Sequence, residues 1–351
     1  MVKKILYGLL IAAPVAIAGR LLNWDPVIVF VAAALAVIPL ADIIGEATEE
    51  LAIRTGPRIG GLLNATLGNA AELIITIFAL NAGLVELVKA SITGSILGNL
   101  LLVLGLSVLA GGLKNGTQHF DRRTAALNGT LVVLAVIALV IPSLFDSAIA
   151  PNTIAETSFS EGVAIIMIAV YALSIVYSFT SQKGPLTREA ADVHKAKWSV
   201  RRSLITLGVA TVAIAVLSEV LVGAVEHVTV SLGLTEFFIG IIIIPLVGNV
   251  AEHLVAVEVA IKNKMELSLA VSLGSSLQVA LFVAPLLVFI SLLFGNPLLL
   301  VFTSFELIAL FSAALVAALV AADGESNWLE GAMLLAVYLI IGLAFFFLPA
   351  V

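Results

Sequence analysis

The stretch that decides how this sequence is read is "IGGLLNATLGNAAELIITIFAL", residues 59–80. It is apolar and long enough to cross a bilayer, for which a helix needs about 20 residues. Glu72 nevertheless lies near its middle, and Asn69 comes one helical turn before it. A charge at the bilayer centre costs at least about 2.5 kcal/mol, so a carboxylate at that depth is itself a hypothesis of function. The stretch predicts a functional site inside a membrane.

Composition supports a membrane protein. Hydrophobic residues make up 61% of the 351 residues and charged residues only 11%, which is more apolar surface than one soluble core can bury. This excludes a soluble enzyme and gives no sign of nucleic-acid binding. Cysteine is absent, so disulfides and thiolate metal sites are excluded. The apolar run after Lys3 and Lys4 lacks a cleavage site and is interpreted as the first membrane span.

Hydropathy predicts an all-α polytopic membrane protein with about eleven transmembrane helices. The predicted spans are 5–22, 27–45, 59–81, 85–112, 125–145, 161–180, 201–226, 235–261, 266–294, 299–321 and 328–348. If the N-terminus is cytoplasmic, all seventeen Lys and Arg residues except Arg20 and Lys89 fall on the cytoplasmic side. Because positive residues favour that side, we expect a multi-pass protein of the plasma membrane with an extracytoplasmic C-terminus.

An internal repeat organises these spans. A shift of 180 residues aligns the two copies without a gap. The matched residues are Ile59-Gly60 with Ile239-Gly240, Gly68-Asn69 with Gly248-Asn249, Ala71-Glu72 with Ala251-Glu252, Glu86-Leu87 with Glu266-Leu267, and Gly94-Ser95 with Gly274-Ser275. Upstream, Thr48-Glu49 falls on Ser218-Glu219 after a difference in loop length.

The matched spans are five apart, and this odd separation gives the two copies opposite orientations in the membrane. The expected layout is an extra N-terminal helix (1–25), a first five-helix repeat (26–180), a polar cytoplasmic linker (181–199) and a second five-helix repeat (200–351). Inverted-topology repeats are typical of secondary transporters, whose substrate site lies near the midplane at the repeat interface.

Each copy places an amide and a carboxylate on one helical face. The residues are Asn69, Glu72 and Thr76 in the first copy and Asn249, Glu252 and Ala256 in the second. The repeat symmetry is expected to bring Glu72 and Glu252 together.

Neighbouring residues offer further oxygen atoms. Gly68 and Gly248 can interrupt their helices and free carbonyl oxygens, while "SITGS" (91–95) and "SLGSSLQ" (272–278) add hydroxyls, glycines and the amide of Gln278. Ca²⁺ prefers about 6–8 hard oxygen ligands, and two carboxylates neutralise its charge. Zinc and copper prefer His or Cys, and only His253 is near. The pattern favours Ca²⁺ as a transported substrate, with no cofactor; Mn²⁺ shares the oxygen preference and stays an alternative.

The same two carboxylates also suit protons. Without a cation, two buried carboxylates repel each other and lose solvation, so at least one of them is expected to take a proton. Ca²⁺ and protons then compete for the same oxygens. That competition is sufficient chemistry for cation/proton antiport.

These residues resemble a known family. "GLLNATLGNAAELIITIFAL" and "VGNVAEHLVAVEVA" are similar to the two signature repeats of the Ca²⁺/H⁺ antiporters of the cation/Ca²⁺ exchanger superfamily. "ATEELAIRTGPRIGG" and "SLGSSLQVALFVAP" resemble their flanking spans, and the resemblance covers about residues 40–345. Many members of this family carry a run of acidic residues between the two halves. This chain departs from that pattern, because residues 181–199 hold only two acids, Glu189 and Asp192.

The resemblance implies eleven helices, of which spans 2 and 7 are long, tilted and mobile around a more rigid core. It implies that Glu72 and Glu252 are the central Ca²⁺ ligands. The assisting ligands that it implies are Asn69, Asn249, Ser95, Ser275, Gln278 and the backbone carbonyls of Gly68 and Gly248. Glu49 and Glu219 would belong to the mobile spans and line the access path.

Several residues have two interpretations. Gly60, Gly68 and Gly94 and their repeat mates could be helix packing contacts, and Ser95 and Ser275 could bond backbone carbonyls instead of an ion. His253 is expected to pack behind the site or to relay protons. Glu258 could line a cytoplasmic vestibule or reach the interface. Glu46 and Glu50, at a helix end, are expected on a solvated face.

Other transporters share this pattern in part. A Na⁺/Ca²⁺ exchanger would need hydroxyl ligands around the acids to build separate Na⁺ sites, whereas "GNAAE" and "GNVAE" have alanine and valine there. A channel is disfavoured because two carboxylates bind a divalent ion too tightly for rapid conduction. The sequence leaves open whether the protein forms a homo-oligomer.

Overall fold

The computed structural model describes residues 6–149, 153–180 and 196–348, so most of the linker predicted at 181–199, with Glu189 and Asp192, lies outside the described residues. In chain order the helices are η1 (Leu9–Ile11), α2 (Ala12–Leu21), α3 (Pro26–Thr55), α4 (Pro57–Leu67), α5 (Ala70–Asn81), α6 (Val85–Leu97), η2 (Gly98–Val103), α7 (Leu104–Asn115), α8 (Arg122–Ile149), α9 (Thr153–Thr180), α10 (Val200–Leu232), α11 (Glu236–Phe238), η3 (Ile239–Ile243), α12 (Ile244–Ile261), α13 (Met265–Gln278), η4 (Val279–Val283), α14 (Ala284–Phe294), α15 (Ser304–Ala322) and α16 (Trp328–Phe346). Two short strands, β1 (Gln118–His119) and β2 (Glu325–Ser326), pair antiparallel, with Gln118 opposite Ser326 and His119 opposite Glu325.

Within the described ranges, eight helices are long and apolar enough to cross a membrane, or nine if the bent segment Glu236–Ile261 counts as one span. Two shorter apolar helices cover Leu6–Leu21 and Ala70–Asn81. The protein is therefore an all-α polytopic membrane protein.

The chain forms two compact units, and each takes residues from both halves of the sequence. The first unit comprises Met1–Ser91, Asp192–Glu252 and Phe346–Val351, and the second comprises Ile92–Ala191 and His253–Phe345.

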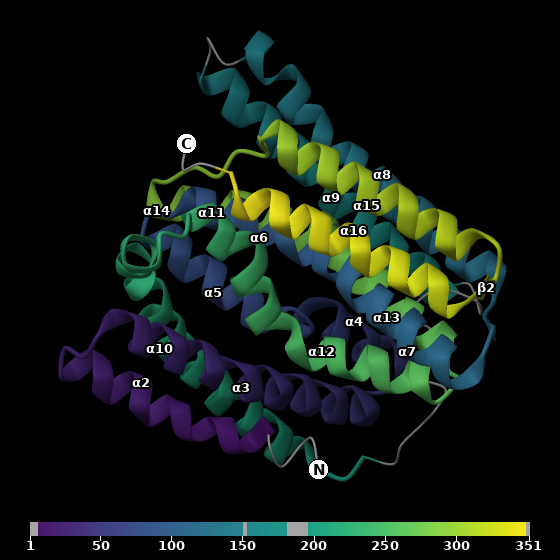
Figure 1. The fold of residues 1–351 in the computed structure, drawn as a ribbon, viewed down its shortest axis with the longest axis horizontal. Helices are drawn as coiled ribbons and strands as arrows, with labels where there is room; N and C mark the ends of the chain where they lie inside the picture. The colour runs from purple at the N-terminus through teal and green to yellow at the C-terminus, as the bar shows by residue number, and fades with distance from the viewer. Residues whose placement is uncertain (1–5, 150–152, 181–195, 349–351) are drawn as a thin grey trace. The chain divides into compact units, whose positions relative to one another are not determined.

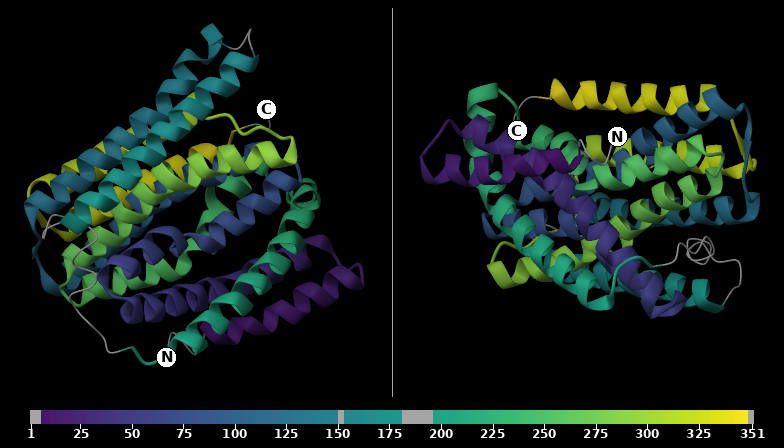
Figure 2. Two further views of the ribbon diagram at one scale, coloured as in Figure 1. Left: turned by 180° about the vertical axis from the view of Figure 1, so that it is seen from behind. Right: turned by 90° about the horizontal axis from the view of Figure 1, so that it is seen from below.

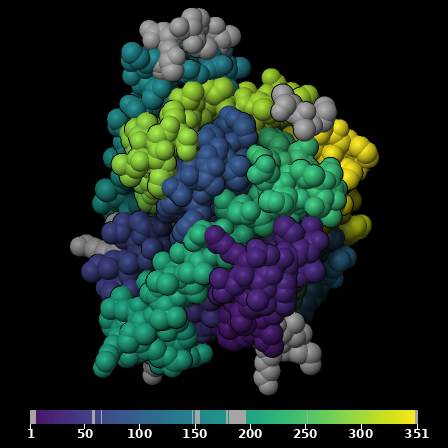
Figure 3. Space-filling model, turned by 90° about the vertical axis from the view of Figure 1, so that its left-hand side faces the viewer, coloured from purple at the N-terminus to yellow at the C-terminus, as the bar shows by residue number. Residues whose placement is uncertain are grey.

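In the first unit, the long helices α3 and α10 lie side by side (Figures 1 and 2). Helix α2 packs on both of them, and Figure 3 shows it covering part of α10. Helix α3 begins with Pro26 after Asp25, whose side chain accepts a hydrogen bond from the Val27 amide (2.8 Å). This arrangement satisfies one of the unpaired amides at the start of a helix.

Helix α3 extends ten residues beyond the end of the span predicted at 27–45, because hydropathy reports depth in the membrane and not where a helix stops. The acidic segment after residue 45 is rich in Ala, Glu and Leu, which are good helix formers whether or not the segment lies in the membrane. The helix ends only at Gly56, whose φ of 84° few other residues adopt.

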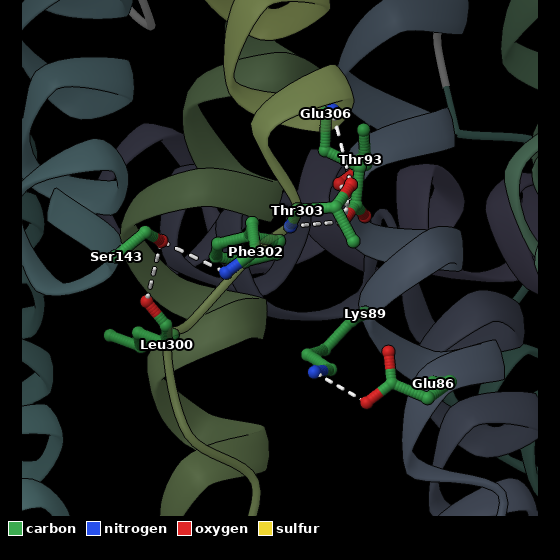
Figure 4. Close-up of polar contacts among 8 residues, drawn as sticks. All are labelled: Glu86, Lys89, Thr93, Ser143, Leu300, Phe302, Thr303 and Glu306. Carbon is green, nitrogen blue, oxygen red and sulfur yellow. Dashed lines mark hydrogen bonds and ion pairs between the residues drawn. The ribbon is translucent and has the colours of Figure 1, made fainter. Parts of the chain in front are cut away.

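In the second unit, α8 packs against α9, α13 and α15, as Figure 2 shows for the α8–α9 pair. The span predicted from residue 299 begins five residues later, at Ser304, because the apolar segment before it is irregular. Hydroxyl groups satisfy its backbone: Ser143 Oγ accepts from the Phe302 amide (2.8 Å) and donates to the Leu300 carbonyl (3.4 Å), as Figure 4 shows. Ser160 Oγ accepts from the Leu300 amide (3.2 Å).

Three segments widen from α-helix to π-helix: η2, η3 and η4. Two of them, η2 and η4, follow α6 and α13 at positions that the shift of 180 residues matches to within one residue. Such turns interrupt the regular hydrogen bonds of a helix and occur often at functional sites.

Candidate ion-binding site

A break in the first repeat positions Glu72. Helix α4 ends at Leu67, Asn69 adopts a non-helical conformation (φ −99°, ψ 28°), and α5 starts at Ala70. Glu72 therefore lies in the first turn of α5, where the positive end of the helix dipole stabilises a carboxylate. Its side chain is only 1% exposed, and that of Asn69 is 2% exposed.

Both repeat copies supply neighbours to Glu72 within the first unit. Asn249 Nδ2 donates to Glu72 Oε2, and Ser91 Oγ donates to Glu72 Oε1; the donor–acceptor distance is 3.5 Å in both hydrogen bonds. A Cβ atom added to Gly248 would lie 3.5 Å from Glu72 Cβ, so the backbone of the second copy approaches this side chain directly. Hydrogen bonds of 3.5 Å are long, so each of these two contacts is weak.

Glu252 lies in α12, at the end of the first unit, and its side chain is only partly buried. The expectation that Gly248 interrupts its helix is wrong, because α12 runs through Gly248 and the bend lies between Val250 and Glu252. The repeat mate, Gly68, directly follows the end of α4. The first copy is therefore interrupted at Asn69 itself, whereas the bend of the second copy follows Asn249.

The predicted ligands Ser95, Ser275 and Gln278 belong to the second unit. All three are buried, Ser95 on α6 and the other two on α13. Ser95 comes one helical turn after Ser91 on the same helix. His253 is also buried, whereas Glu258 is exposed and forms an ion pair with Lys262 Nζ (2.6 Å). This pair favours the interpretation that Glu258 reaches the interface.

The two predicted access residues differ in their partners. Both Glu49, on α3, and Glu219, on α10, are exposed. Arg20 Nη2 of α2 lies 2.8 Å from Glu219 Oε1. Among the described residues, Glu49 makes no hydrogen bond or ion pair.

The sequence interpretation missed the burial of Glu50. Its side chain is only 8% exposed, and its Oε2 accepts from the Trp198 amide (2.9 Å). Arg54 Nε donates to the Trp198 carbonyl (3.0 Å), so the segment before α10 is attached to the end of α3. The expected solvated face is wrong here because a backbone segment from the linker, which no local pattern reveals, covers the acid.

A further buried acid, Glu306, was also missed. Thr93 Oγ1 donates to its Oε1 (2.9 Å), and the amide and hydroxyl of Thr303 donate to its Oε2 (2.8 and 2.9 Å), as Figure 4 shows. The motif "TSFE" at 303–306 is the signal that could have found it, because Thr and Glu three residues apart form a capping box at a helix start. Glu306 joins α6 to the start of α15.

The donors around Glu72 are carboxylate, amide and hydroxyl groups, which suit a hard divalent cation. Among the described residues, no three His, Asp or Glu side chains gather as a metal centre would require. The protein class is accordingly a polytopic membrane protein in which amide and hydroxyl groups surround a buried glutamate.

Sequence comparison identifies the family. Residues 26–180 and 202–347 each match the family described as "sodium/calcium exchanger protein", and the chain belongs to this family. A Ca²⁺/H⁺ antiporter of Aphanothece halophytica is 46% identical, over 99% of this chain and 97% of the relative. The Ca²⁺/H⁺ antiporter ChaA of Bacillus subtilis is 43% identical, over 98% of this chain and 99% of the relative.

Solved structures agree with this placement. Native YfkE superposes with a TM-score of 0.87 at 42% identity, covering 98% of this chain and 100% of that chain. The H⁺/Ca²⁺ exchanger CAX shares the fold, with a TM-score of 0.71 at 17% identity, over 99% of this chain and 92% of that chain.

Proposed function

We propose that this protein is a secondary active transporter that exchanges Ca²⁺ for H⁺ by alternating access, with both ions competing for Glu72 and Glu252. The observation that carries the proposal is the contact between Glu72 and the Gly248-Asn249 segment, which brings the repeated motif into one oxygen-rich place. The relatives named as Ca²⁺/H⁺ antiporters match nearly the whole chain.

The ligand set that we propose for Ca²⁺ contains Glu72, Glu252, Asn69 and Asn249, the carbonyls of Gly68 and Gly248, and Ser95, Ser275 and Gln278. The hydrogen bonds from Ser91 and Asn249 to Glu72 support it, because a cation can replace two bonds of 3.5 Å at little cost. When Ca²⁺ leaves, protons compensate the charge of the two carboxylates. Each state is then neutral enough to remain buried.

The proposed topology has eleven spans in two inverted five-helix repeats, with an extra N-terminal helix, a cytoplasmic N-terminus and an extracytoplasmic C-terminus in the plasma membrane. Contacts between span ends support it, because each joins ends that the topology assigns to one face. On the proposed cytoplasmic face they are Tyr7–Glu46, Arg54–Trp198, Gln118–Asn263 and Arg122–Ala322. On the outer face they are Arg20–Glu219, Ser143–Phe302 and Ser160–Leu300.

The family match in two copies, at 26–180 and 202–347, and the matching π-helical turns η2 and η4 also support a repeat. We propose the same boundaries for the repeats as the sequence predicts, with 181–199 as the cytoplasmic linker.

Transport in proteoliposomes tests the function. With an imposed pH gradient, radioactive Ca²⁺ should accumulate without Na⁺. The inhibition of this uptake by excess Mn²⁺ measures how well Mn²⁺ competes with Ca²⁺. Accumulation that requires a Na⁺ gradient would identify a Na⁺/Ca²⁺ exchanger instead. Flux without any gradient of a counter-ion would indicate a channel.

Calorimetric titration tests the shared site. If Ca²⁺ displaces two protons, its apparent dissociation constant should rise by up to about 100-fold for each unit by which the pH falls below both carboxylate pKa values. This corresponds to about 2.7 kcal/mol in binding free energy. Buffers of different ionisation enthalpy count the released protons. Ca²⁺ binding without proton release between about pH 6 and 8 contradicts the competition mechanism.

A further inference from the structure

Buried polar atoms without hydrogen-bond partners gather around one helix of the second unit. On α13 they are the hydroxyls of Ser268 and Ser272 and the Nε2 of Gln278. Helices α7 and α8 both pack against α13, and they contribute the hydroxyl of Ser107 and the Oδ1 of Asn128. We call these five residues, together with the buried Ser275, the inner seam.

The serines of α13 form a regular file. Ser268, Ser272 and Ser275 are spaced i, i+4 and i+7, which places them on one face of the helix. Their spacing along the axis is about 6 and 4.5 Å, a gap that one water molecule bridges between two hydroxyls.

All members of the inner seam lie between one end of the second unit and mid-helix. Hydrogen bonds join the end of α7 to the α12–α13 turn, from Asn115 Nδ2 to the Ile261 carbonyl (3.2 Å) and from Gln118 Nε2 to Asn263 Oδ1 (3.1 Å). At about 1.5 Å per residue from these helix ends, the depths are about 5 Å for Ser268, 9 Å for Asn128, 10 Å for Ser272, 12 Å for Ser107, 15 Å for Ser275 and 20 Å for Gln278. No step between successive depths exceeds about 5 Å.

Burying this many polar groups without water or another hydrogen-bond partner costs folding free energy. Each buried group without a partner costs about 1–3 kcal/mol, and buried groups of this kind in proteins are normally bonded to internal water. A file of hydroxyls and waters can both donate and accept at every position. It therefore passes a proton by a series of hops, in which one proton enters at one end while another leaves at the other.

At the matching positions, helix α6 of the first repeat carries no such file of serines. The repeat mates of Ser268 and Ser272 are Val88 and Ile92, which are buried and apolar. The hydroxyls that α6 does carry nearby, Ser91 and Thr93, donate to Glu72 and Glu306. The file on α13 thus has no counterpart on α6, and Ser107 and Asn128 of the first half of the chain complete the seam.

We propose that the inner seam is a hydrated proton path from the cytoplasmic face to the level of Ser275 and Gln278, separate from the route of Ca²⁺. The proposal rests on the proposed exchange function for its direction and its cargo. The seam meets the proposed Ca²⁺ ligands only at its inner end, at Ser275 and Gln278. Ca²⁺ is excluded from the rest of the seam because its residues carry no charge, and the ion needs several oxygens, carboxylates among them, to give up its water.

The test converts the seam into its repeat mate with Ser268→Val and Ser272→Ile together. We expect H⁺-driven Ca²⁺ uptake to fall about tenfold, or about 1.4 kcal/mol in activation free energy. Exchange of Ca²⁺ for Ca²⁺ at equal pH should stay within about twofold of wild type, because it moves no proton. The matched control is Ser276→Ala, which removes a buried hydroxyl of the same helix that is already bonded to the Ser272 carbonyl (2.9 Å).

The outcomes separate the proposals. Equal loss in both assays indicates a packing defect and overturns the proton path, as does an unchanged rate of H⁺-driven uptake. If wild-type protein releases no proton on binding Ca²⁺, the proposed function itself fails.

A second measurement does not depend on the bulky variant. The chain has no cysteine, so Ser272→Cys introduces a single thiol. Ag⁺, which is small enough to follow water, should block H⁺-driven uptake by this variant when applied from the cytoplasmic side. The repeat-mate variant Ile92→Cys should be insensitive; equal sensitivity of both, or of neither, contradicts a one-sided hydrated seam.

Discussion

The two copies of the repeated motif carry the same amide and carboxylate but surround them differently. Glu72 follows a helix break, is buried and is bonded by Asn249 and Ser91. Glu252 lies within α12 and is partly exposed. A symmetric sequence therefore produces an asymmetric site in this conformation, which is what an alternating-access mechanism needs if the two carboxylates take turns in facing water.

The same contrast extends to the residues around the motif. Arg20, on the helix outside the repeat, compensates the charge of Glu219. Glu49, the repeat mate of Glu219, has no such cation among the described residues. Ser268 and Ser272 have apolar mates. These differences show that the two copies of the motif have different surroundings among the described residues.

The largest effect is expected from the carboxylates themselves. Glu72→Gln and Glu252→Gln should each abolish H⁺-driven Ca²⁺ uptake, because an amide neither neutralises Ca²⁺ nor takes the proton. Uptake into proteoliposomes measures this, with gel filtration to confirm that each variant is folded. The control is Glu86→Gln, at an exposed glutamate paired with Lys89. Substantial transport by one variant would exclude its residue from the site. Only the carboxylate of the other copy would then be required for transport.

A smaller, sided effect is expected at the access residues. Glu49→Gln should weaken the apparent Ca²⁺ affinity about two- to fivefold when measured from the cytoplasmic face, because it removes an uncompensated charge. Glu219→Gln should change the affinity little, because Arg20 already compensates that carboxylate.

Arg20→Gln completes this comparison. It should raise the apparent affinity measured from the outer face by about two- to fivefold, and only while Glu219 is present. Affinities measured on right-side-out and inside-out vesicles check all three variants. If every variant matches wild type from both faces, the assignment of access roles is wrong.

The hydroxyl of Ser91 sharpens the contrast between the two carboxylates. Its repeat mate is Val271, so Ser91→Val makes the first copy resemble the second. Because Ca²⁺ must replace this hydrogen bond, removing a bond of up to about 1 kcal/mol should strengthen Ca²⁺ binding by up to about fivefold. Calorimetry measures it, and Thr130→Val, which removes a hydroxyl bonded within α8, is the control. An unchanged affinity would show that this bond does not distinguish the two copies.

Packing glycines are the feature in which the copies agree, and transport should respond to them least. A Cβ on Gly240 would lie 2.7 Å from the Leu87 carbonyl, and one on Gly60 would lie 2.6 Å from the Ala52 carbonyl. Gly240→Ala should lower the free energy of unfolding by about 1–3 kcal/mol. Gly223→Ala, where nothing lies within 4 Å, should leave it unchanged or raise it by up to about 1 kcal/mol. Thermal unfolding in detergent compares them, and equal melting temperatures contradict the packing role.

Local patterns predicted much of this architecture. The apolar runs located the membrane-spanning helices, because hydropathy over about 20 residues reflects the solvent around a helix. They misplaced the end of α3, which Gly56 sets, and the start of α15, where Thr303 begins the helix with a capping box. Caps and turns obey backbone conformation, which hydropathy does not measure.

The candidate site divides in the same way. The positions of Glu72 and Asn249 were readable because a buried charge is rare and the repeat doubled the signal. The burial of Glu50 beneath the segment around Trp198 was not readable, and neither was the Arg20–Glu219 pair. Both depend on residues more than a hundred positions apart in the chain.

The sequence by itself determined the solvent, the helices, the repeat and the identity of the two carboxylates, because composition and periodicity are local properties that the chain carries in any conformation. Only the tertiary structure decided which carboxylate is buried, which acid Arg20 compensates, and that α7 and α8, which carry unpaired polar atoms among the described residues, pack against α13. The physical reason is that burial and hydrogen bonding are set by whichever distant helix packs alongside, and a twofold repeat of residues does not impose a twofold repeat of neighbours.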